Sequence, residues 1–189
     1  MTFEFREEGH IYLLNGVRIP GVTEVLPWGY GSGHEFQRLR GKHVHSAIQL
    51  FNEGVLDEDS LDPQLLPYLS AYRKFREEHD LNGIYDIKTG TPHPCTELQL
   101  AGYYLLVEAQ NFPYGVLLSE VKTYHSVYRF AGTIDFAVIY KMPCPVHALY
   151  LQENGGYKLV DHTKELRKNI QIFLSFLTTY KWTREKNLM

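Results

Sequence analysis

Short runs of hydrophobic and polar residues alternate over the first 25 residues, which predicts a β-hairpin. Apolar runs stand on both sides of Asn15-Gly16. Asn-Gly between two apolar runs is a strong hairpin signal, because both residues accept the positive φ that a tight turn requires. We therefore expect an N-terminal hairpin extension within residues 1–33.

Apolar residues recur at helical spacing in four longer segments. The first of these is followed by Gly54, which provides a stop. The apolar faces of the first two segments consist of Phe36, Leu39, Val44, Ala47, Ile48 and Phe51, and of Leu65, Leu66, Leu69, Tyr72 and Phe75. We expect helices over residues 34–52, 63–79, 97–110 and 163–181. We also expect a short helical turn that Thr23 caps and that ends near Trp28, followed by a loop over 29–33.

Runs of β-branched and aromatic residues predict the strands. The sequence Asn154-Gly155-Gly156 separates the last two runs and indicates a second hairpin. The expected strands cover residues 83–89, 116–124, 128–140, 146–152 and 157–161. Because helices and strands are intermixed along the chain, the expected class is α/β (α+β), with a mixed central sheet flanked by helices.

Composition limits the class of protein. The 189 residues are 44% hydrophobic and 22% charged, as in a soluble globular protein, and their number fits one domain over 1–189. Cys95 and Cys144 each stand beside proline rather than in a metal-ligand pair. No segment reaches the length of about 20 apolar residues that crosses a membrane, so a soluble, cytoplasmic protein is expected. The net charge of −3 argues against a general polyanion-coating protein but leaves room for a local basic groove.

Asp86 and Lys88 place an anion and a cation side by side, since alternate side chains of a strand point the same way. A carboxylate can hold Mg²⁺, and a neighbouring ammonium can orient a water or stabilise charge on a phosphate. The alternative for this pair is a solvated strand face with a weak surface ion pair.

Asp135 follows Gly132-Thr133-Ile134 and precedes an apolar stretch. A carboxylate in such a strand either faces solvent or is buried with a partner, because an isolated buried charge is very costly. A metal ion would be such a partner. The alternative is that Asp135 points outward from an edge strand.

These segments together resemble the PD-(D/E)XK nuclease superfamily, and in particular its RecB-like, phage-type exonuclease branch. In that branch an aspartate in G-x-x-D and an acidic-x-Lys strand bind the catalytic metals, and the following helix carries Q-x-x-x-Y. The matching segments here are Gly132-Thr133-Ile134-Asp135, Asp86-Ile87-Lys88-Thr89-Gly90 and Gln99-Leu100-Ala101-Gly102-Tyr103. Gln99 and Tyr103 share a helix face, which suits a role in steadying Lys88 or contacting DNA, although a packed helix face is the alternative.

The resemblance extends to two further residues. His45, in Gly41-Lys42-His43-Val44-His45, matches the histidine of a G-x-x-x-H helix that can ligate a metal. Glu120 matches a first-strand glutamate that can assist a metal or its waters. The alternatives are a core or surface histidine and an outward-facing glutamate. The implied metal ligands are thus Asp86, Asp135, His45 and the Ile87 carbonyl.

The order of the motifs departs from the family. There the glutamate strand and G-x-x-D come before the acidic-x-Lys strand and its helix, whereas here residues 83–111 precede residues 116–140. The junctions over 112–115 and 141–145 are short and contain proline. The carboxylates of Asp86 and Asp135 can meet only if these connections are long enough to bring their strands together.

The resemblance implies a Mg²⁺- or Mn²⁺-dependent DNA nuclease, an exonuclease of phage or prophage recombination with a strand-annealing protein as partner, and it allows a homo-oligomer. One alternative is a non-catalytic DNA-binding or assembly module, and another is a hydrolase of small phosphorylated molecules. Some basic residues could hold the phosphate backbone, although solubility charge explains any single one of them better: Arg38, Arg40, Lys42, Lys122 and Arg129.

Overall fold

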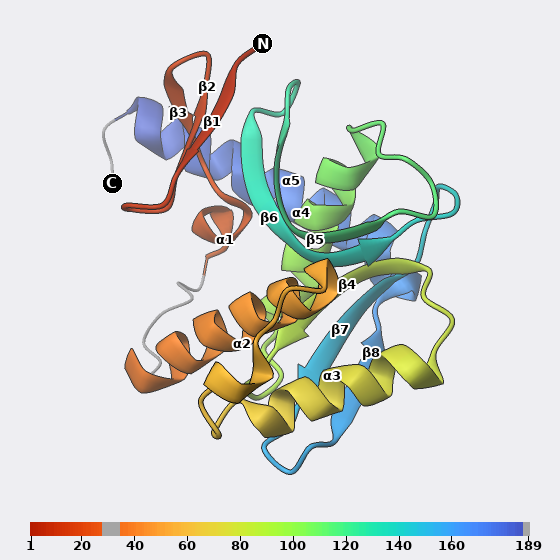
Figure 1. Cartoon of the computed structure of the whole chain (residues 1–189). Helices are drawn as coiled ribbons and strands as arrows, with labels where there is room; N and C mark the ends of the chain where they lie inside the picture. Colours follow the sequence, from red (N-terminus) through yellow and green to blue (C-terminus); the bar gives the residue numbers. More distant parts are fainter. Residues whose placement is uncertain (28–34, 187–189) are drawn as a thin grey trace.

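A five-stranded mixed sheet forms the centre of the molecule in the computed structural model, which describes residues 1–27 and 35–186 (Figure 1). Its strand order is β5-β6-β4-β7-β8, where β4 and β7 are parallel and the other neighbours are antiparallel. The strands are β4 (Gly83–Lys88), β5 (Leu117–His125), β6 (Phe130–Val138), β7 (Val146–Leu151) and β8 (Tyr157–Asp161). The expected mixed sheet and α+β class are confirmed.

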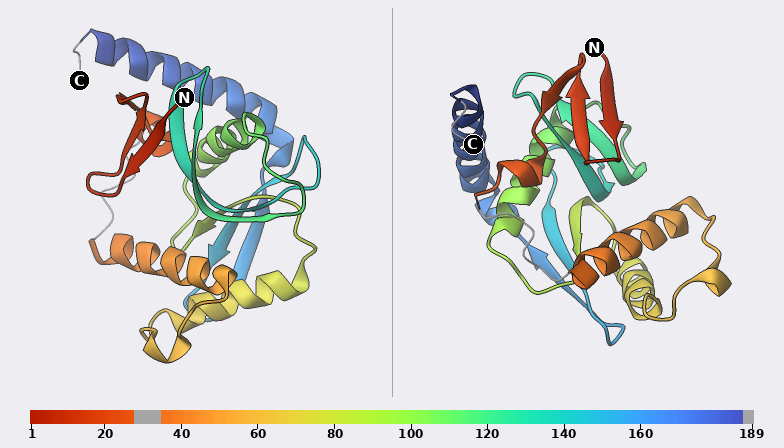
Figure 2. Two further views of the ribbon diagram at one scale, coloured as in Figure 1. Left: turned by 45° about the horizontal axis from the view of Figure 1, so that its top comes forward. Right: turned by 90° about the vertical axis from the view of Figure 1, so that its left-hand side faces the viewer.

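Helices cover both faces of this sheet, as the right-hand view of Figure 2 shows. One apolar cluster joins α4 (Cys95–Glu108) and α5 (Leu166–Glu185) to one face, and a second joins α2 (Glu35–Glu53) and α3 (Leu66–Glu78) to the other. Short 3-10 turns stand at Glu58–Ser60 and Thr163–Glu165. Within the described chain, no helix combines the length and apolar character that crossing a membrane requires.

The N-terminal segment forms a three-stranded antiparallel sheet instead of a single hairpin, composed of β1 (Phe3–Arg6), β2 (Ile11–Leu14) and β3 (Val17–Ile19). The predicted turn is confirmed, with φ of 53° at Asn15 and 76° at Gly16. Helix α1 (Val22–Val25) begins after Gly21, so the expectation that Thr23 caps it was wrong. The predicted end near Trp28 and the loop over 29–33 lie outside the described residues.

The first turns of α2 depart from the predicted apolar face. Val44, Ala47 and Ile48 are buried as expected, but Phe36 is 61% exposed and Leu39 is 43% exposed. The buried residues pack with α3 and the central sheet, whereas Phe36 and Leu39 line an open surface groove at the beginning of the helix. Periodicity identified the helix but not the part of it that meets the core.

The unusual chain order still places β4 at the centre, between β6 and β7. The end of β6 and the start of β7 lie at the same end of the sheet, since Val138 pairs with Gly83 and Val146 with Ile84. The seven-residue connection over 139–145 therefore only needs to pass over the start of β4, which lies between β6 and β7. Gly83 permits this close approach, because a Cβ there would lie 2.8 Å from the Pro145 carbonyl oxygen and its φ is +143°.

We expect Gly102→Ala to lower the free energy of unfolding by up to about 2 kcal/mol. Alanine favours a helix by about 1 kcal/mol, but a Cβ at Gly102 would lie 2.8 Å from Val22 Cγ1 and 3.0 Å from the Phe173 ring. Overpacking of this kind typically costs about 1–3 kcal/mol. Chemical denaturation measures the change.

The matched control is Gly41→Ala, also within a helix. A Cβ at Gly41 would make only an ordinary contact, 3.5 Å from Thr89 Oγ1. This substitution should stabilise the protein by up to about 1 kcal/mol. Equal effects of the two substitutions would contradict the assignment of Gly102 as the contact point of α4 with α1 and α5.

Candidate functional site

Asp86 and Lys88 point the same way from β4, as the strand period predicted. Lys88 Nζ donates a hydrogen bond to Asp86 Oδ1 at 2.8 Å. Asp86 has no exposed surface, and its second oxygen, Oδ2, is buried without a hydrogen-bond partner among the described residues. The alternative of a solvated surface ion pair was therefore wrong. A buried carboxylate oxygen without a partner is costly and is typical of a site that receives a ligand or ion.

Asp135 comes from the neighbouring strand β6 and is 6% exposed. Because β6 lies between β5 and β4, the alternative of an outward-facing residue on an edge strand was wrong. Asp135 Oδ2 accepts a hydrogen bond from the backbone N–H of Ile87 at 2.9 Å. This bond ties Asp135 to the strand that carries Asp86, so the two carboxylates meet despite the order of their motifs along the chain.

His45 projects from α2 between the two strands and Glu120. Its Nε2 lies 3.0 Å from the Ile87 carbonyl oxygen, and its Nδ1 lies 2.8 Å from Glu120 Oε1 and 3.9 Å from Asp135 Oδ1. His45, Glu120 and Asp135 each offer one ligand atom, and these three atoms lie within 4.8 Å of one another. The alternatives of an ordinary surface histidine and an outward-facing Glu120 were therefore wrong.

Glu120 adopts an uncommon backbone conformation for the middle of a strand, with a φ of +51°. The ladder between β5 and β6 pairs Ser119 with Phe136 and resumes with Val121 and Ile134. Glu120 thus lies opposite Asp135 where regular pairing is interrupted. A left-handed residue other than glycine stores about 1–3 kcal/mol of strain and is found most often at functional sites. Here the distortion accompanies the contact of Glu120 with His45.

The acidic groups and the histidine shift one another's protonation. Burial raises the pKa of Asp86, and the Asp135 carboxylate raises it further, although Lys88 opposes both effects. Burial also raises the pKa of Asp135, against the nearby charge of His45. For His45, burial lowers the pKa, but Asp135 and Glu120 outweigh burial and raise it to about 9. Without a metal, protonated His45 thus holds the carboxylates of Glu120 and Asp135 together.

Gln99 and Tyr103 extend the site onto α4. Lys88 Nζ donates to Gln99 Oε1 at 3.0 Å, and Gln99 Nε2 donates to the Tyr103 hydroxyl at 2.6 Å. Both α4 residues are buried, and burial with the nearby Asp135 and Asp86 raises the pKa of Tyr103 well above its usual value. The Tyr103 hydroxyl therefore stays neutral, and Gln99 fixes the position of the Lys88 ammonium.

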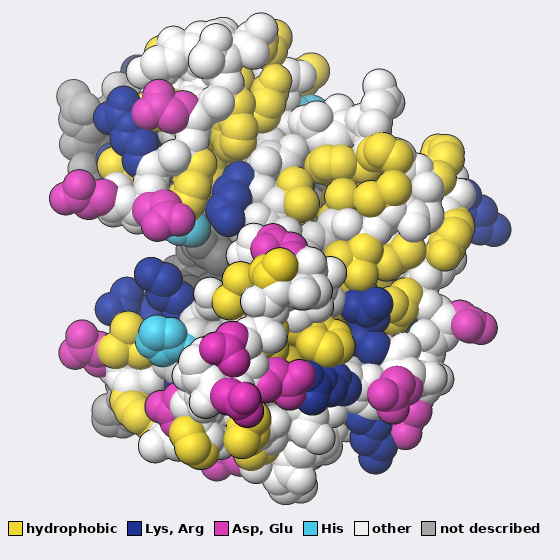
Figure 3. All heavy atoms as spheres, in the orientation of Figure 1, with side chains coloured by type: hydrophobic (Ala, Val, Ile, Leu, Met, Phe, Trp, Pro, Cys, Tyr) yellow, Lys and Arg dark blue, Asp and Glu magenta, His cyan; other side chains and the backbone are white. Residues whose placement is uncertain are grey.

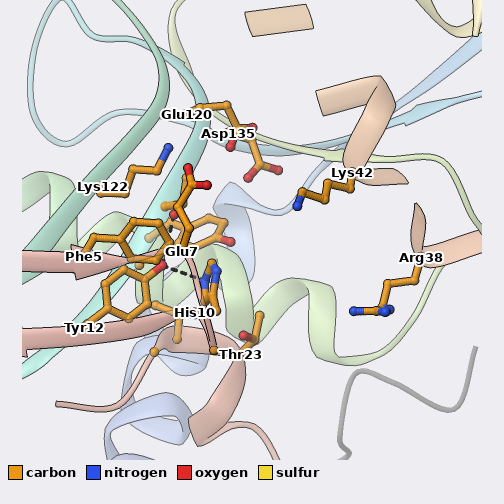
Figure 4. A pocket seen from close by; sticks show the side chains of 16 residues that line it. Phe5, Glu7, His10, Tyr12, Thr23, Arg38, Lys42, Glu120, Lys122 and Asp135 are labelled. Carbon is orange, nitrogen blue, oxygen red and sulfur yellow. Dashed lines mark hydrogen bonds between the residues drawn. The ribbon is translucent and has the colours of Figure 1, made fainter. Parts of the chain in front are cut away.

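An open cleft of about 710 Å³ gives access to Glu120, Asp135 and Tyr103. It lies between the N-terminal sheet and α2, where Figure 3 shows a hollow with basic side chains on its rims. Figure 4 shows Arg38 and Lys42 on the α2 side and Lys122 on the opposite side. Of the other predicted backbone contacts, Arg40 instead pairs with Glu153 at 2.6 Å, and Arg129 lines a separate groove beside Lys181.

The sequence did not indicate that the N-terminal sheet contributes to this cleft. The Tyr12 hydroxyl lies 2.9 Å from His10 Nε2 and 3.0 Å from Thr133 Oγ1. Thr133 is two positions before Asp135 on β6. Phe5 also lines the cleft. No local pattern could have predicted the contact of Tyr12 with Thr133, because more than 100 residues separate them.

Comparisons of this chain with models of protein families, with curated protein sequences and with solved structures find no match. The function of the protein therefore has to be inferred from the geometry of the site itself.

The donor set fits a divalent cation. Carboxylates and a backbone carbonyl supply the hard oxygen ligands that Mg²⁺ and Mn²⁺ prefer, and an imidazole is a ligand that transition metals such as Mn²⁺ accept. The buried Oδ2 of Asp86, to which no residue of the described chain hydrogen-bonds, is a further oxygen that such an ion could satisfy. Because a ligating histidine must be neutral, a bound ion would take the place of the proton of His45.

In the absence of metal, the protein should lose stability at alkaline pH. The pKa of His45 is raised from 6.5 to about 9, so its contribution is complete below about pH 6.5 and is lost as the pH rises through about 9. We expect a loss of roughly 1–3 kcal/mol, discounted because the side chain is partly exposed. Urea denaturation in EDTA at about pH 6 and about pH 10 measures it.

The control is His45→Gln, which keeps a hydrogen-bonding side chain without the titration. Its stability should fall less over the same pH interval. If the stability of the wild-type protein and that of this variant fall by the same amount, the charge of His45 does not hold the carboxylates of Glu120 and Asp135 together.

Proposed function

We propose that this protein is a Mg²⁺- or Mn²⁺-dependent nuclease that hydrolyses phosphodiester bonds of DNA. The observation that carries the proposal is the meeting of His45, Glu120 and Asp135 beside the Asp86–Lys88 pair, at a cleft that has basic side chains on both walls. A phosphodiester needs what this arrangement offers, namely anionic ligands for a divalent ion, an ammonium near the reacting group and cations for the flanking phosphates.

The proposed metal ligands are His45, Glu120, Asp135, the Ile87 carbonyl oxygen and Asp86. When bound there, a divalent ion would lower the pKa of a water molecule and offset charge on the attacked phosphate. The Ile87 peptide holds two of these ligands in place, since its N–H donates to Asp135 and its carbonyl accepts from His45. The ligands therefore have fixed positions before any substrate arrives.

Lys88 is proposed as the residue that orients the attacking water or stabilises charge on the phosphate. Its ammonium is held by Asp86 at 2.8 Å and by Gln99 at 3.0 Å. Gln99 is in turn fixed by Tyr103. Gln99 and Tyr103 act in this proposal as positioning residues, because their hydrogen bonds restrict where the ammonium can lie.

The finer parts of the proposal come from the resemblance to the PD-(D/E)XK superfamily and its RecB-like, phage-type branch. These are an exonuclease activity, a cytoplasmic role in phage or prophage recombination, a strand-annealing protein as partner and a homo-oligomeric state. The support from geometry is that the segments around Asp135, Asp86–Lys88 and Gln99–Tyr103 meet in space, although their order along the chain differs from that of the family.

We expect Lys88→Ala to reduce cleavage of linear DNA in Mg²⁺ by about 100-fold or more, in line with the loss of one charge-stabilising donor in other enzymes. Release of nucleotides from duplex and single-stranded DNA measures the rate, and EDTA should abolish it in the wild-type protein. The matched control is Lys158→Ala, an exposed lysine of the edge strand β8, which should leave the rate unchanged.

Other outcomes point to the two alternatives. DNA binding by the wild-type protein without metal-dependent cleavage would favour a non-catalytic DNA-binding or assembly module. Hydrolysis of small phosphate esters with DNA left intact would favour a hydrolase of small phosphorylated molecules. Either result would overturn the nuclease proposal.

A further inference from the structure

We propose that the cleft takes DNA as a single strand, with the ring of Phe5 as the platform on which one base stacks. This inference deepens the proposed function and depends on it for the nature of the polymer. It is carried by the position of Phe5 and Lys122 on one wall of the cleft, opposite Arg38 and Lys42 on α2 (Figure 4).

Phe5 is held rigidly enough to act as a platform. Its ring lies 5.0 Å from the ring of Tyr12 and 5.0 Å from that of His10, which it meets edge-on at 79°. Tyr12 is only 2% exposed, and its hydroxyl is fixed by contacts with His10 and Thr133. Phe5 itself is only partly buried and lines the cleft. A ring that is supported on one side and open to the cleft can stack with a base at little entropic cost.

A cation already lies against this platform. Lys122 Nζ is 5.8 Å from the centre of the Phe5 ring, within reach of a cation–π contact. A base that stacks on Phe5 would displace the ammonium, which is then near enough to pair with the adjoining phosphate. Aromatic platforms beside basic side chains are the usual means by which proteins bind single strands without strict sequence preference.

The described residues of α2 that line the opposite wall are both basic, and neither is aromatic. Arg38 and Lys42 are exposed, come from successive turns of α2 and line the cleft. They lie on the same helix as His45, so phosphates held there would be next to the proposed metal ligands. Glu7 lines the wall of Phe5, so on that side stacking must supply more of the affinity than charge does.

The form of the platform favours a single strand over a duplex. Within a duplex both faces of every internal base are covered by neighbouring bases, so only an unstacked base can lie on Phe5. The cleft volume of about 710 Å³ is also that of sites that enclose a ligand of drug size, which corresponds to one or two nucleotides.

Binding measurements in EDTA test the inference without turnover. Fluorescence anisotropy with a short single strand and with a blunt duplex of the same sequence should show tighter binding of the single strand. Phe5→Leu, which keeps apolar packing against Tyr12 but removes the aromatic face, should weaken single-strand binding about tenfold or more. Phe5→Tyr, which restores the ring, should bind like the wild-type protein.

Two further variants serve as controls. Phe3→Leu alters a ring of the same strand that stacks on Tyr124 and, at 6.2 Å, on Tyr12. Phe3 does not line the cleft, so this variant tests whether loss of packing behind the platform is enough to weaken binding, and it should leave binding unchanged. Lys122→Ala should reduce the dependence of log affinity on log salt concentration by about 0.7, the value for one phosphate of a single strand. This variant tests the same wall even if Phe5→Leu fails to fold.

The inference is overturned if the blunt duplex binds as tightly as the single strand, or if both Phe5→Leu and Lys122→Ala bind the single strand like the wild-type protein. Its failure is distinct from that of the proposed function. If metal-dependent cleavage is lost in Lys88→Ala but unchanged in Phe5→Leu, the nuclease proposal holds and the stacking platform does not. Single-strand binding that depends on Phe5, without cleavage in Mg²⁺, would leave the platform without the nuclease.

Discussion

The structure depends on the burial of carboxylates close to one another. Asp86 is fully buried and Asp135 almost so, and each would be very unfavourable as an isolated charge. Lys88 and the N–H of Ile87 compensate for part of this cost, and His45 joins Asp135 to Glu120. Within residues 1–27 and 35–186, one oxygen of Asp86 still lacks a hydrogen-bond partner, so these residues compensate for its burial only in part. Asp86, Asp135 and Glu120 therefore form an acidic group that would be stabilised by one more positive charge, as a cation site requires.

The fold meets this constraint by converging on Ile87 from several elements. β4 supplies the peptide at the centre, β6 brings Asp135 to its N–H, and α2 brings His45 to its carbonyl. On α4, Gln99 holds the ammonium of Lys88. The strained backbone at Glu120 belongs to the same arrangement, since local distortion persists only where surrounding contacts outweigh its cost.

The N-terminal sheet gives this site its surroundings. It packs on β6 through Tyr12, Leu14, Ile19 and Ala131, and so forms a second wall across from α2. The described residues on the α2 wall are basic, whereas the other wall carries an aromatic ring beside Lys122 and Glu7, so the two walls are chemically different. That difference is the basis for assigning a single strand to the cleft, because phosphates and bases are recognised by different groups.

The sequence determined the local parts of the site, because a strand period of two and a helix period near four place Asp86 beside Lys88 and Gln99 beside Tyr103. It also gave the existence and type of the longer helices and of the central strands. Tertiary structure alone decided that Asp135 bonds Ile87, that His45 contacts Glu120, and that Phe5 lines the cleft. These contacts join residues 48 and 75 positions apart in the first two cases, and no local period reaches so far. The backbone of Glu120 was equally beyond the sequence, since its strain is set by its neighbours in space and not by those along the chain.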